Sequence, residues 1–138
     1  MKRLSGKNAF ISGSSRGIGL ACAKALAEQG ANVFLVATNE VLLKEATSAI
    51  QERSAVQVGF HAVDLRTLEG CQQASNAFNE RFGQADILVN SAGATKGGIF
   101  PEQSDEEMID GFALKFHGAV RLCRCLLYTS DAADDIPR

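Results

Sequence analysis

Residues 8–19 read NAFISGSSRGIG, an apolar run that leads into three closely spaced glycines. The apolar residues at 8–11 predict a short buried strand. After the glycines, apolar residues recur at helical spacing over residues 17–29, namely Ile18, Ala21, Cys22, Ala25 and Leu26. A turn from a strand into a helix presents backbone N–H groups at the positive end of the helix, which attracts phosphate. The stretch therefore predicts a strand, a phosphate-binding loop and a helix.

The same alternation of strand and helix continues along the chain. Apolar runs predict strands at residues 32–37, 56–63 and 86–89, and Gly30 and Gly83 end the helices before two of them. The helix predicted over residues 40–53 has its apolar face at Leu42, Ala46, Ala49 and Ile50. Thr67 caps the next helix, whose stripe is Cys71, Ser75, Phe78 and Phe82. A capping box at residues 104–107 starts a last helix, with the stripe Met108, Phe112, Phe116, Val120 and Cys123.

Strands and helices that alternate in this rhythm indicate the fold class. Parallel strands joined by helices need right-handed crossovers, and the helices then cover both faces of the sheet. The nearly continuous apolar run at residues 32–37 is typical of a strand covered on both faces. The sequence therefore predicts an α/β fold with a doubly wound parallel sheet, in the strand order 3-2-1-4.

Composition excludes several classes of partner. The chain has 138 residues, a formal net charge of -2 and 46% hydrophobic residues, as in one globular domain. It has no basic field and no long apolar run, so neither nucleic acid nor a membrane is an expected partner. Met1 is followed by basic and then polar residues, so the expected location is the cytoplasm. Cys22, Cys71, Cys123 and Cys125 fit a reducing compartment and form no metal-binding pattern, and the first two are expected to be buried.

Three motifs lie at the ends of predicted strands: GSSRGIG at 13–19, VDL at 63–65 and NSAG at 90–93. In the first, one glycine allows a sharp turn, and the other two leave room for a pyrophosphate and for close helix packing. In this order, the motifs resemble the short-chain dehydrogenase/reductase family over residues 4–124. Ser12 stands where the family has Thr, and Ser91 where it has a second Asn. The resemblance implies a Rossmann-like fold with further strands beyond these four.

The resemblance also implies cofactor contacts, residue by residue. The pyrophosphate of a nicotinamide dinucleotide would lie on the loop of Gly13, Ser14, Ser15, Arg16, Gly17, Ile18 and Gly19, with the Ile18 N–H directed at it. Asp64 would accept a hydrogen bond from the adenine amino group, and the Leu65 N–H would meet a ring nitrogen. Asn90, Ala92 and Gly93 would line the adenosine ribose and brace the central strand. A helix cap is the alternative role for Asp64, but Thr67 fits that role better.

The end of the second predicted strand favours NADP over NAD. NAD enzymes usually carry a carboxylate there for the ribose hydroxyls, and this chain has Ala37. Arg16 supplies a base for the 2′-phosphate, and Thr38 and Asn39 add hydroxyl and amide donors. The Arg that NADP enzymes of the family usually carry after the second strand would fall at Thr38 and is absent. A solvated loop position is the alternative for Arg16.

The resemblance implies hydride transfer between nicotinamide and a small-molecule carbonyl or alcohol substrate, with a proton from the Tyr of a Y-x-x-x-K pair. The chain contains no such pair, because Tyr128 is its one tyrosine and Lys115 its last lysine. Lys115 stands at the position of the family's helix Asn, which supports a proton relay, and a plain surface lysine is the alternative. No residue identifies the substrate; a reductase of 3-oxoacyl thioesters is one candidate.

Residues 125–135 read CLLYTSDAADD, interrupt the helical stripe and match nothing in the family. They look like the in-frame translation of a transposase-based sequencing adapter, and such segments are set aside in fold reasoning. We therefore predict a truncated NAD(P)-binding Rossmann domain at residues 1–124, the N-terminal half of a dehydrogenase. Residues 125–138 are interpreted as a non-native tail.

Two alternatives stay open at this point. The apolar stripe of the last helix predicts a homodimer or homotetramer, because this helix pairs between subunits in the resembling family; alternatively, the stripe covers the sheet. The rival to an enzyme is a dinucleotide-binding module without catalysis, such as a sensor of the cofactor's redox state. An FAD or S-adenosylmethionine domain fits the loop spacing and NSAG less well. The reading frame beyond residue 124 distinguishes the enzyme from the sensor.

Overall fold

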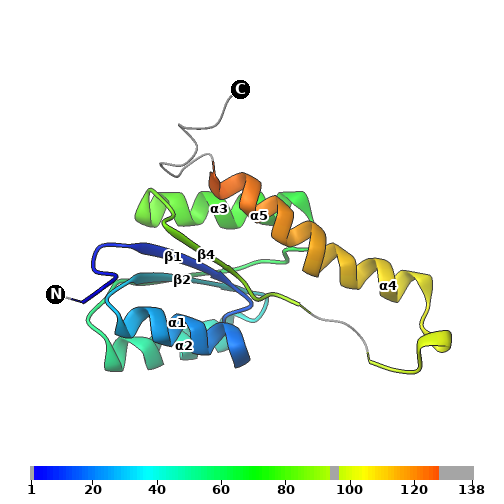
Figure 1. The fold of residues 1–138 in the computed structure, drawn as a ribbon, viewed down its shortest axis with the longest axis horizontal. Helices are drawn as coiled ribbons and strands as arrows, with labels where there is room; N and C mark the ends of the chain where they lie inside the picture. Colours follow the sequence, from blue (N-terminus) through cyan, green and yellow to red (C-terminus); the bar gives the residue numbers. More distant parts are fainter. Residues whose placement is uncertain (1, 94–96, 128–138) are drawn as a thin grey trace.

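A computed structural model of the chain describes residues 2–93 and 97–127. Its centre is a four-stranded parallel sheet in the order β3-β2-β1-β4 (Figure 1). The strands are β1 (Asn8–Ser12), β2 (Asn32–Ala37), β3 (Val58–Ala62) and β4 (Ile87–Asn90). Phe10 of β1 lies opposite Phe34 of β2 on one side and Leu88 of β4 on the other. The α/β class and the predicted strand order are therefore confirmed.

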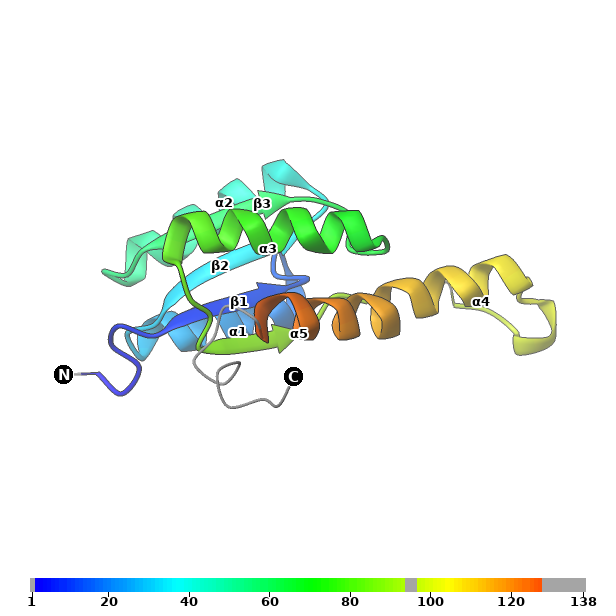
Figure 2. The ribbon, with the colours of Figure 1, turned by 90° about the horizontal axis from the view of Figure 1, so that it is seen from above.

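Helices cover both faces of the sheet (Figure 2). One face carries α1 (Gly17–Glu28) and α2 (Glu40–Arg53), and the other carries α3 (Leu68–Phe82) and α5 (Ala119–Leu127). Because successive strand residues point to opposite faces, Ile11 packs with α1 and α2 while Phe10 packs with α3 and α5. The rings of Phe10, Phe34 and Phe78 contact one another with centroids 5.5 to 5.9 Å apart. These aromatic contacts fix α3 on its face of the sheet.

The buried face of α1 differs from the predicted one. The predicted stripe began at Ile18, whose side chain is 78% exposed, and Cys22 is only half-buried. The residues that α1 buries are Gly19, Ala23 and Ala27. These small residues let the helix axis approach the sheet closely, so the tight interface excludes the larger side chains. Hydrophobicity alone therefore indicated the wrong face of this helix.

The predicted faces of α2 and α3 agree better with the structure. The residues that α2 buries are Leu43, Ala46, Thr47 and Ile50, two of which were predicted. The residues that α3 buries include Cys71, Ser75 and Phe78, as predicted, while Phe82 is partly buried. Thr67 caps α3, accepting a hydrogen bond from the Gly70 N–H at 3.0 Å, and Gly83 ends it with a φ of +82°. The amphipathic pattern was thus informative wherever large side chains form the interface.

The last predicted helix has three parts in the structure. The capping box at Ser104 starts α4 (Asp105–Phe112), which continues as a π-helical segment, η2 (Ala113–Gly118), and then as α5. A short 3-10 turn, η1 (Phe100–Glu102), precedes α4, which extends away from the sheet (Figure 1). The predicted stripe is exposed, with 46% for Met108, 58% for Phe112, 56% for Phe116 and 40% for Val120. The alternative that this stripe covers the sheet is therefore wrong.

The contact of this helix with the sheet comes instead from Leu122 and Leu126. Both are buried and pack in the cluster that contains Phe10 and Phe78. They lie one helical turn apart, so α5 continues through residues 125–127, where the sequence pattern predicted an interruption. The remainder of the predicted non-native tail lies outside the described residues. Within residues 2–93 and 97–127, no helix combines the length and the hydrophobicity needed to cross a membrane.

Candidate functional site

A cleft of about 380 Å³ lies at the carboxyl ends of the strands. From β1 the chain builds the sheet outward through β2 and β3 on one side, and β4 then pairs with the other side of β1. Open α/β sheets bind ligands at such a reversal of strand order, outside the carboxyl ends of the strands. Its lining comes from five segments that are far apart in the sequence, namely Gly13, Ser15, Arg16, Gly17, Ile18 and Gly19; Ala37 and Thr38; Val63, Asp64, Leu65 and Arg66; Ser91, Ala92 and Gly93; and Leu114 of η2. The three predicted motifs therefore meet in one cavity.

The glycine loop has a conformation that only glycine fits without strain. Gly13 and Gly17 have φ values of +62° and +60°, a region that side chains disfavour. A Cβ on Gly13 would lie 2.7 Å from the backbone of Ala92, and a Cβ on Gly19 would collide with the Gly13 carbonyl. A Cβ on Gly17 would meet nothing within 4 Å. The loop therefore leaves open space beside Gly17 and packs tightly against its neighbours at Gly13 and Gly19, as a binding site for an anionic group requires.

Two buried serines hold this loop against the sheet. The Ser12 Oγ accepts hydrogen bonds from the N–H groups of Ser91 and Ala92, both at 3.1 Å, and so fixes the loop that follows β4. The Ser14 hydroxyl donates to the Ile11 carbonyl at 2.7 Å and accepts from the Val36 N–H at 3.0 Å.

These contacts revise the expectation for Ser14, which was predicted to hold phosphate. Its side chain is fully buried, it does not line the cleft, and its hydroxyl and N–H both bind the backbone. The other predicted loop residues all line the cleft. No role was predicted for Ser12. The signal for it was that the family pattern has Thr at this position, which also carries a hydroxyl.

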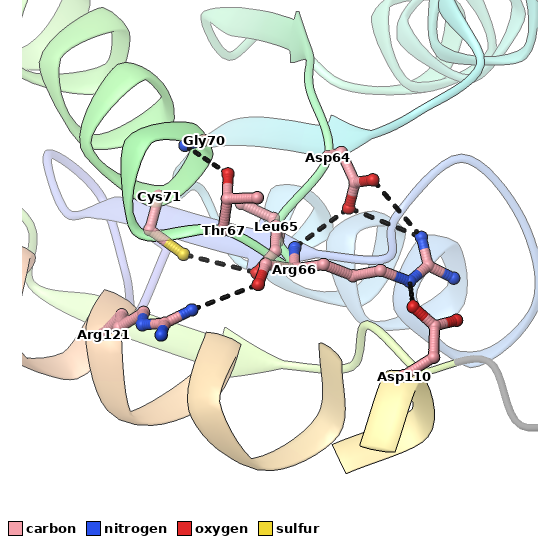
Figure 3. A network of polar contacts seen from close by, with 8 residues as sticks. All are labelled: Asp64, Leu65, Arg66, Thr67, Gly70, Cys71, Asp110 and Arg121. Atoms are coloured by element: carbon pink, nitrogen blue, oxygen red, sulfur yellow. Dashed lines mark hydrogen bonds and ion pairs between the residues drawn. The ribbon is translucent and has the colours of Figure 1, made fainter. Parts of the chain in front are cut away.

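The loop after β3 presents a carboxylate and a guanidinium to the cleft. Asp64 Oδ1 accepts a hydrogen bond from the Arg66 N–H at 2.9 Å, and half of the Asp64 side chain is exposed. Because Thr67 caps α3, Asp64 is free of the helix-capping role that was its alternative. Arg66 was not predicted; its guanidinium lies 3.4 Å from Asp64 and 3.1 Å from Asp110 of α4 (Figure 3).

The predicted determinants of cofactor choice divide between the cleft and its surroundings. Arg16, Ala37 and Thr38 line the cleft, and Arg16 is exposed. Asn39 does not line it, because its Oδ1 accepts a hydrogen bond from the Leu42 N–H at 3.0 Å and caps α2. The cleft thus has two arginines in its lining, Arg16 and Arg66, and no carboxylate at the end of β2.

Of the predicted residues at the end of β4 and in the loop after it, some line the cleft and one does not. Ala92 and Gly93 line the cleft, whereas Asn90 does not, and its amide lies 3.7 Å from the Cys123 sulfur. A Cβ on Gly93 would lie 2.6 Å from Cε of Lys115, so the lysine side chain runs over this glycine. Lys115 also lines a second cavity of about 670 Å³, together with Phe112 and Phe116. Lys115 therefore stands between the cleft and this second cavity.

The cysteines offer no reactive group to the cleft. Burial raises the pKa of Cys71 to about 11, and its thiol donates to the Leu65 carbonyl at 3.5 Å. Since the thiolate is the reactive form, Cys71 acts as a packed, neutral side chain at physiological pH. Across residues 2–93 and 97–127, no three His, Cys, Asp or Glu side chains gather as a metal site.

Comparison with known proteins agrees with this geometry. The family model for short chain dehydrogenase matches residues 7–133. The chain is 35% identical over 101 residues to the 3-oxoacyl-[acyl-carrier-protein] reductase FabG of Chlamydia muridarum, covering 73% of this chain and 41% of that protein. It spans about half the length of the relatives and solved structures that it matches.

Two solved structures share the fold closely. L-sorbose reductase from Gluconobacter frateurii, complexed with NADPH and L-sorbose, has a TM-score of 0.86 at 42% identity, covering 90% of this chain and 47% of that one. An alcohol dehydrogenase from Thermococcus sibiricus, complexed with 5-hydroxy-NADP, has a TM-score of 0.84 at 32% identity, covering 89% of this chain and 52% of that one. With its fold, its glycine loop and a family match over nearly its whole length, the chain belongs to the short chain dehydrogenase family.

Proposed function

We propose that the chain is the cofactor-binding half of an oxidoreductase that transfers hydride between NADP(H) and a carbonyl or alcohol carbon. The observation that carries this proposal is the cleft in which the glycine loop, Asp64 and Gly93 meet. The open space beside Gly17 fits a pyrophosphate, which suits the cofactor named for the two solved relatives. The relative from Chlamydia muridarum makes 3-oxoacyl thioesters one candidate substrate class.

Each part of the cleft has a proposed role toward the cofactor. The loop from Gly13 to Gly19 binds the pyrophosphate, with the Ile18 N–H at the start of α1 as a donor. Asp64 accepts from the adenine amino group, and the Leu65 N–H donates to a ring nitrogen. Ala92 and Gly93 line the ribose, and Asn90 at the end of β4 braces the strand behind them. When bound, the nicotinamide supplies or accepts the hydride.

Lys115 has a proposed positioning role at the reactive end of the cleft. Its side chain crosses Gly93 and enters the second cavity, where the family pattern has an Asn that supports a proton relay. An ammonium at this place donates hydrogen bonds but cannot accept them. Lys115 therefore orients an oxygen acceptor, such as a water or a ribose hydroxyl, rather than passing a proton in both directions.

Arg16 is expected to select NADPH over NADH. Replacing it with Ala removes the guanidinium of the glycine loop from the cleft lining and leaves Arg66, which is ion-paired with Asp64 and Asp110. The loss of a charged hydrogen bond to the 2′-phosphate weakens NADPH binding by about 1–3 kcal/mol, and NADH binding changes little. Isothermal titration of the wild-type and Arg16→Ala chains with both cofactors measures this difference.

The matched control for Arg16 is Arg53→Ala. Arg53 lies in the last turn of α2, and it does not line the cleft. This variant should bind both cofactors like the wild type. Equal weakening of NADPH and NADH by Arg16→Ala would show that Arg16 does not read the 2′-phosphate.

A second copy of the protein is proposed to cover the exposed face that runs along α4 and η2 to the start of α5. Met108, Phe112, Phe116 and Val120 present a continuous apolar face, with Ile109 beside it at 60% exposure. Large apolar faces of this kind mark interaction sites. The complete protein is expected to sediment as a dimer or tetramer at micromolar concentration, and Phe116→Asp should shift it toward the monomer. A wild-type protein that sediments as a monomer would contradict this proposal.

The alternative function is a dinucleotide-binding module that senses the redox state of the cofactor. What would distinguish it from an enzyme is a Tyr–x–x–x–Lys pair in the complete protein, a pair that these 138 residues do not include. The natural reading frame beyond residue 124 decides between the two functions, because an enzyme of this family needs the Ser and the Tyr–Lys pair there.

We also propose that residues 125–138 are non-native, and that the free cysteines indicate a reducing compartment, the cytoplasm.

A further inference from the structure

Arg66 connects the cleft to the helix that extends away from the sheet. Its backbone N–H donates to Asp64 Oδ1 at 2.9 Å, and its Nη1 lies 3.4 Å from Oδ1 and 3.5 Å from Oδ2 of the same carboxylate. Its Nε lies 3.1 Å from Oδ1 of Asp110, a residue of α4 that does not line the cleft (Figure 3). The guanidinium is therefore held between two carboxylates, one inside the cleft and one outside.

The backbone beneath this ion-pair chain is fixed by neighbouring helices. Arg121 of α5 donates to the Arg66 carbonyl at 3.1 Å, and the Cys71 thiol of α3 donates to the Leu65 carbonyl (Figure 3). A Cβ on Gly118 would lie 2.9 Å from the Leu65 oxygen, so η2 packs directly on the loop. Because the backbone is held in this way, the remaining freedom in the loop lies in the side chains of Asp64 and Arg66.

The three side chains of this ion-pair chain differ in their exposure to solvent. The Arg66 side chain is 29% exposed, against 53% for Asp64 and 58% for Asp110. The half-exposed Asp64 carboxylate is fixed by the Arg66 N–H at 2.9 Å and by the longer guanidinium contacts, and the same guanidinium forms the ion pair with Asp110. Arginine's rigid fork of donors suits this bridging role better than lysine's single ammonium.

We propose that Arg66 is a positioning residue for base recognition: it fixes the Asp64 carboxylate toward the base, and Asp110 holds Arg66 in place. This inference rests on the proposed role of Asp64 toward the adenine amino group. A fixed carboxylate accepts a hydrogen bond from the exocyclic amino group of adenine and repels the exocyclic carbonyl oxygen that hypoxanthine carries on the same ring carbon. Selectivity for adenine thus depends on Asp110, a residue outside the cleft.

The test compares NADP+ with its hypoxanthine analogue, nicotinamide hypoxanthine dinucleotide phosphate. Isothermal titration of the 138-residue chain gives a dissociation constant for each ligand, and their ratio reports base selectivity without any catalytic step. We expect Arg66→Ala to lower this ratio about tenfold, the effect of one charge-assisted hydrogen bond. Asp110→Asn keeps the size of the side chain and removes its charge, so a loss of about threefold is expected for this exposed ion pair.

Two further variants separate positioning from a merely structural effect. Arg66→Lys keeps the positive charge and should recover part of the ratio lost in Arg66→Ala. Arg81→Ala is the matched control, because Arg81 does not line the cleft and donates to the Val58 carbonyl at 3.4 Å, at the opposite end of β3 from Asp64. A structural loss would lower the midpoint of thermal unfolding and weaken both ligands equally, which leaves the ratio unchanged.

Asp64→Ala distinguishes failure of this inference from failure of the proposed function. If Asp64→Ala lowers the ratio while Arg66→Ala and Asp110→Asn leave it at the wild-type value, the positioning role is overturned and the adenine site stands. An unchanged ratio in Asp64→Ala overturns the assignment of Asp64 itself. A wild-type chain that binds neither ligand at millimolar concentration overturns the proposed cofactor site.

Discussion

Replacing Gly13 with Ala is expected to destabilise the chain by about 2–5 kcal/mol and to weaken NADPH binding about 10–100-fold. Two costs add at this position. The φ of +62° is unfavourable for a residue with a Cβ, and that Cβ would lie 2.7 Å from the Ala92 backbone. The loop after β4 must move away from the cleft to relieve the contact. Urea unfolding measures the stability, and titration with NADPH measures the binding.

Gly17→Ala and Gly19→Ala separate the two costs. Gly17 has a similar φ of +60°, but a Cβ there meets nothing within 4 Å, so only the backbone penalty of about 1–2 kcal/mol is expected. Gly19 lies at a φ that other residues adopt, and a Cβ there collides with the Gly13 carbonyl. Gly13→Ala should therefore be more damaging than Gly17→Ala. Equal losses of stability in these two variants would contradict the steric part of the argument.

The fold class was predictable because alternating strands and helices indicate a parallel sheet with right-handed crossovers. The order that places β3 and β4 at the two edges of the described sheet is typical of the doubly wound fold that binds dinucleotides, which the glycine loop after β1 indicated. The site motifs were predictable for the same reason, since the carboxyl ends of parallel strands meet at one edge. Asp64 and Gly93 therefore lie in one cleft although many residues separate them in the sequence.

The errors have a common physical origin in tertiary contacts that a local pattern does not contain. The close approach of α1 to the sheet depends on Gly19, Ala23 and Ala27, whose small size carries almost no hydrophobic signal. Ser14 sits inside the predicted loop, but its hydroxyl binds the backbone of β2. The contact between Arg66 and Asp110 joins two segments that are adjacent only after folding. Neither periodicity nor spacing indicates such a pair.

The sequence pattern did not predict the π-helical segment η2, which lies beside the candidate site. A π-helical turn places one more residue in the turn than an α-helix does, and such turns are frequent at functional sites. Here η2 contains Lys115 and ends at Gly118, which packs on the Leu65 carbonyl. The same short segment thus supports the loop after β3 and carries Lys115 over Gly93. The exposed apolar residues on this helix recur every four residues, with Phe112 in α4, Phe116 in η2 and Val120 in α5.

The chain as sequenced is expected to bind NADPH without using it to reduce a ketone. Hydride transfer to a carbonyl needs a proton donor in the transition state, and a positioned general acid contributes about 10²–10⁴ in rate. The only tyrosine is Tyr128, its fourth following residue is Ala132, and no lysine follows Lys115. Following NADPH absorbance with a panel of ketones and 3-oxoacyl thioesters measures turnover. The chain should give no rate above a preparation from cells that carry the empty vector.

The matched comparison is the complete natural reading frame, in which residues 1–124 are followed by the sequence that the genome encodes. If that sequence supplies a Ser and a Tyr–x–x–x–Lys pair, we expect turnover to appear and solubility to rise together. The two effects have separate causes. The Ser and the Tyr–Lys pair supply the proton donor, whereas solubility depends on β4, which is an edge strand of the described sheet with half-buried Ile87 and Val89, and an unpaired apolar edge favours aggregation. A following strand would pair with β4 and close the nicotinamide end of the cleft. Turnover by a soluble, monodisperse 138-residue chain would show that the proton donor lies among its own residues, with Lys115 as the first candidate to replace.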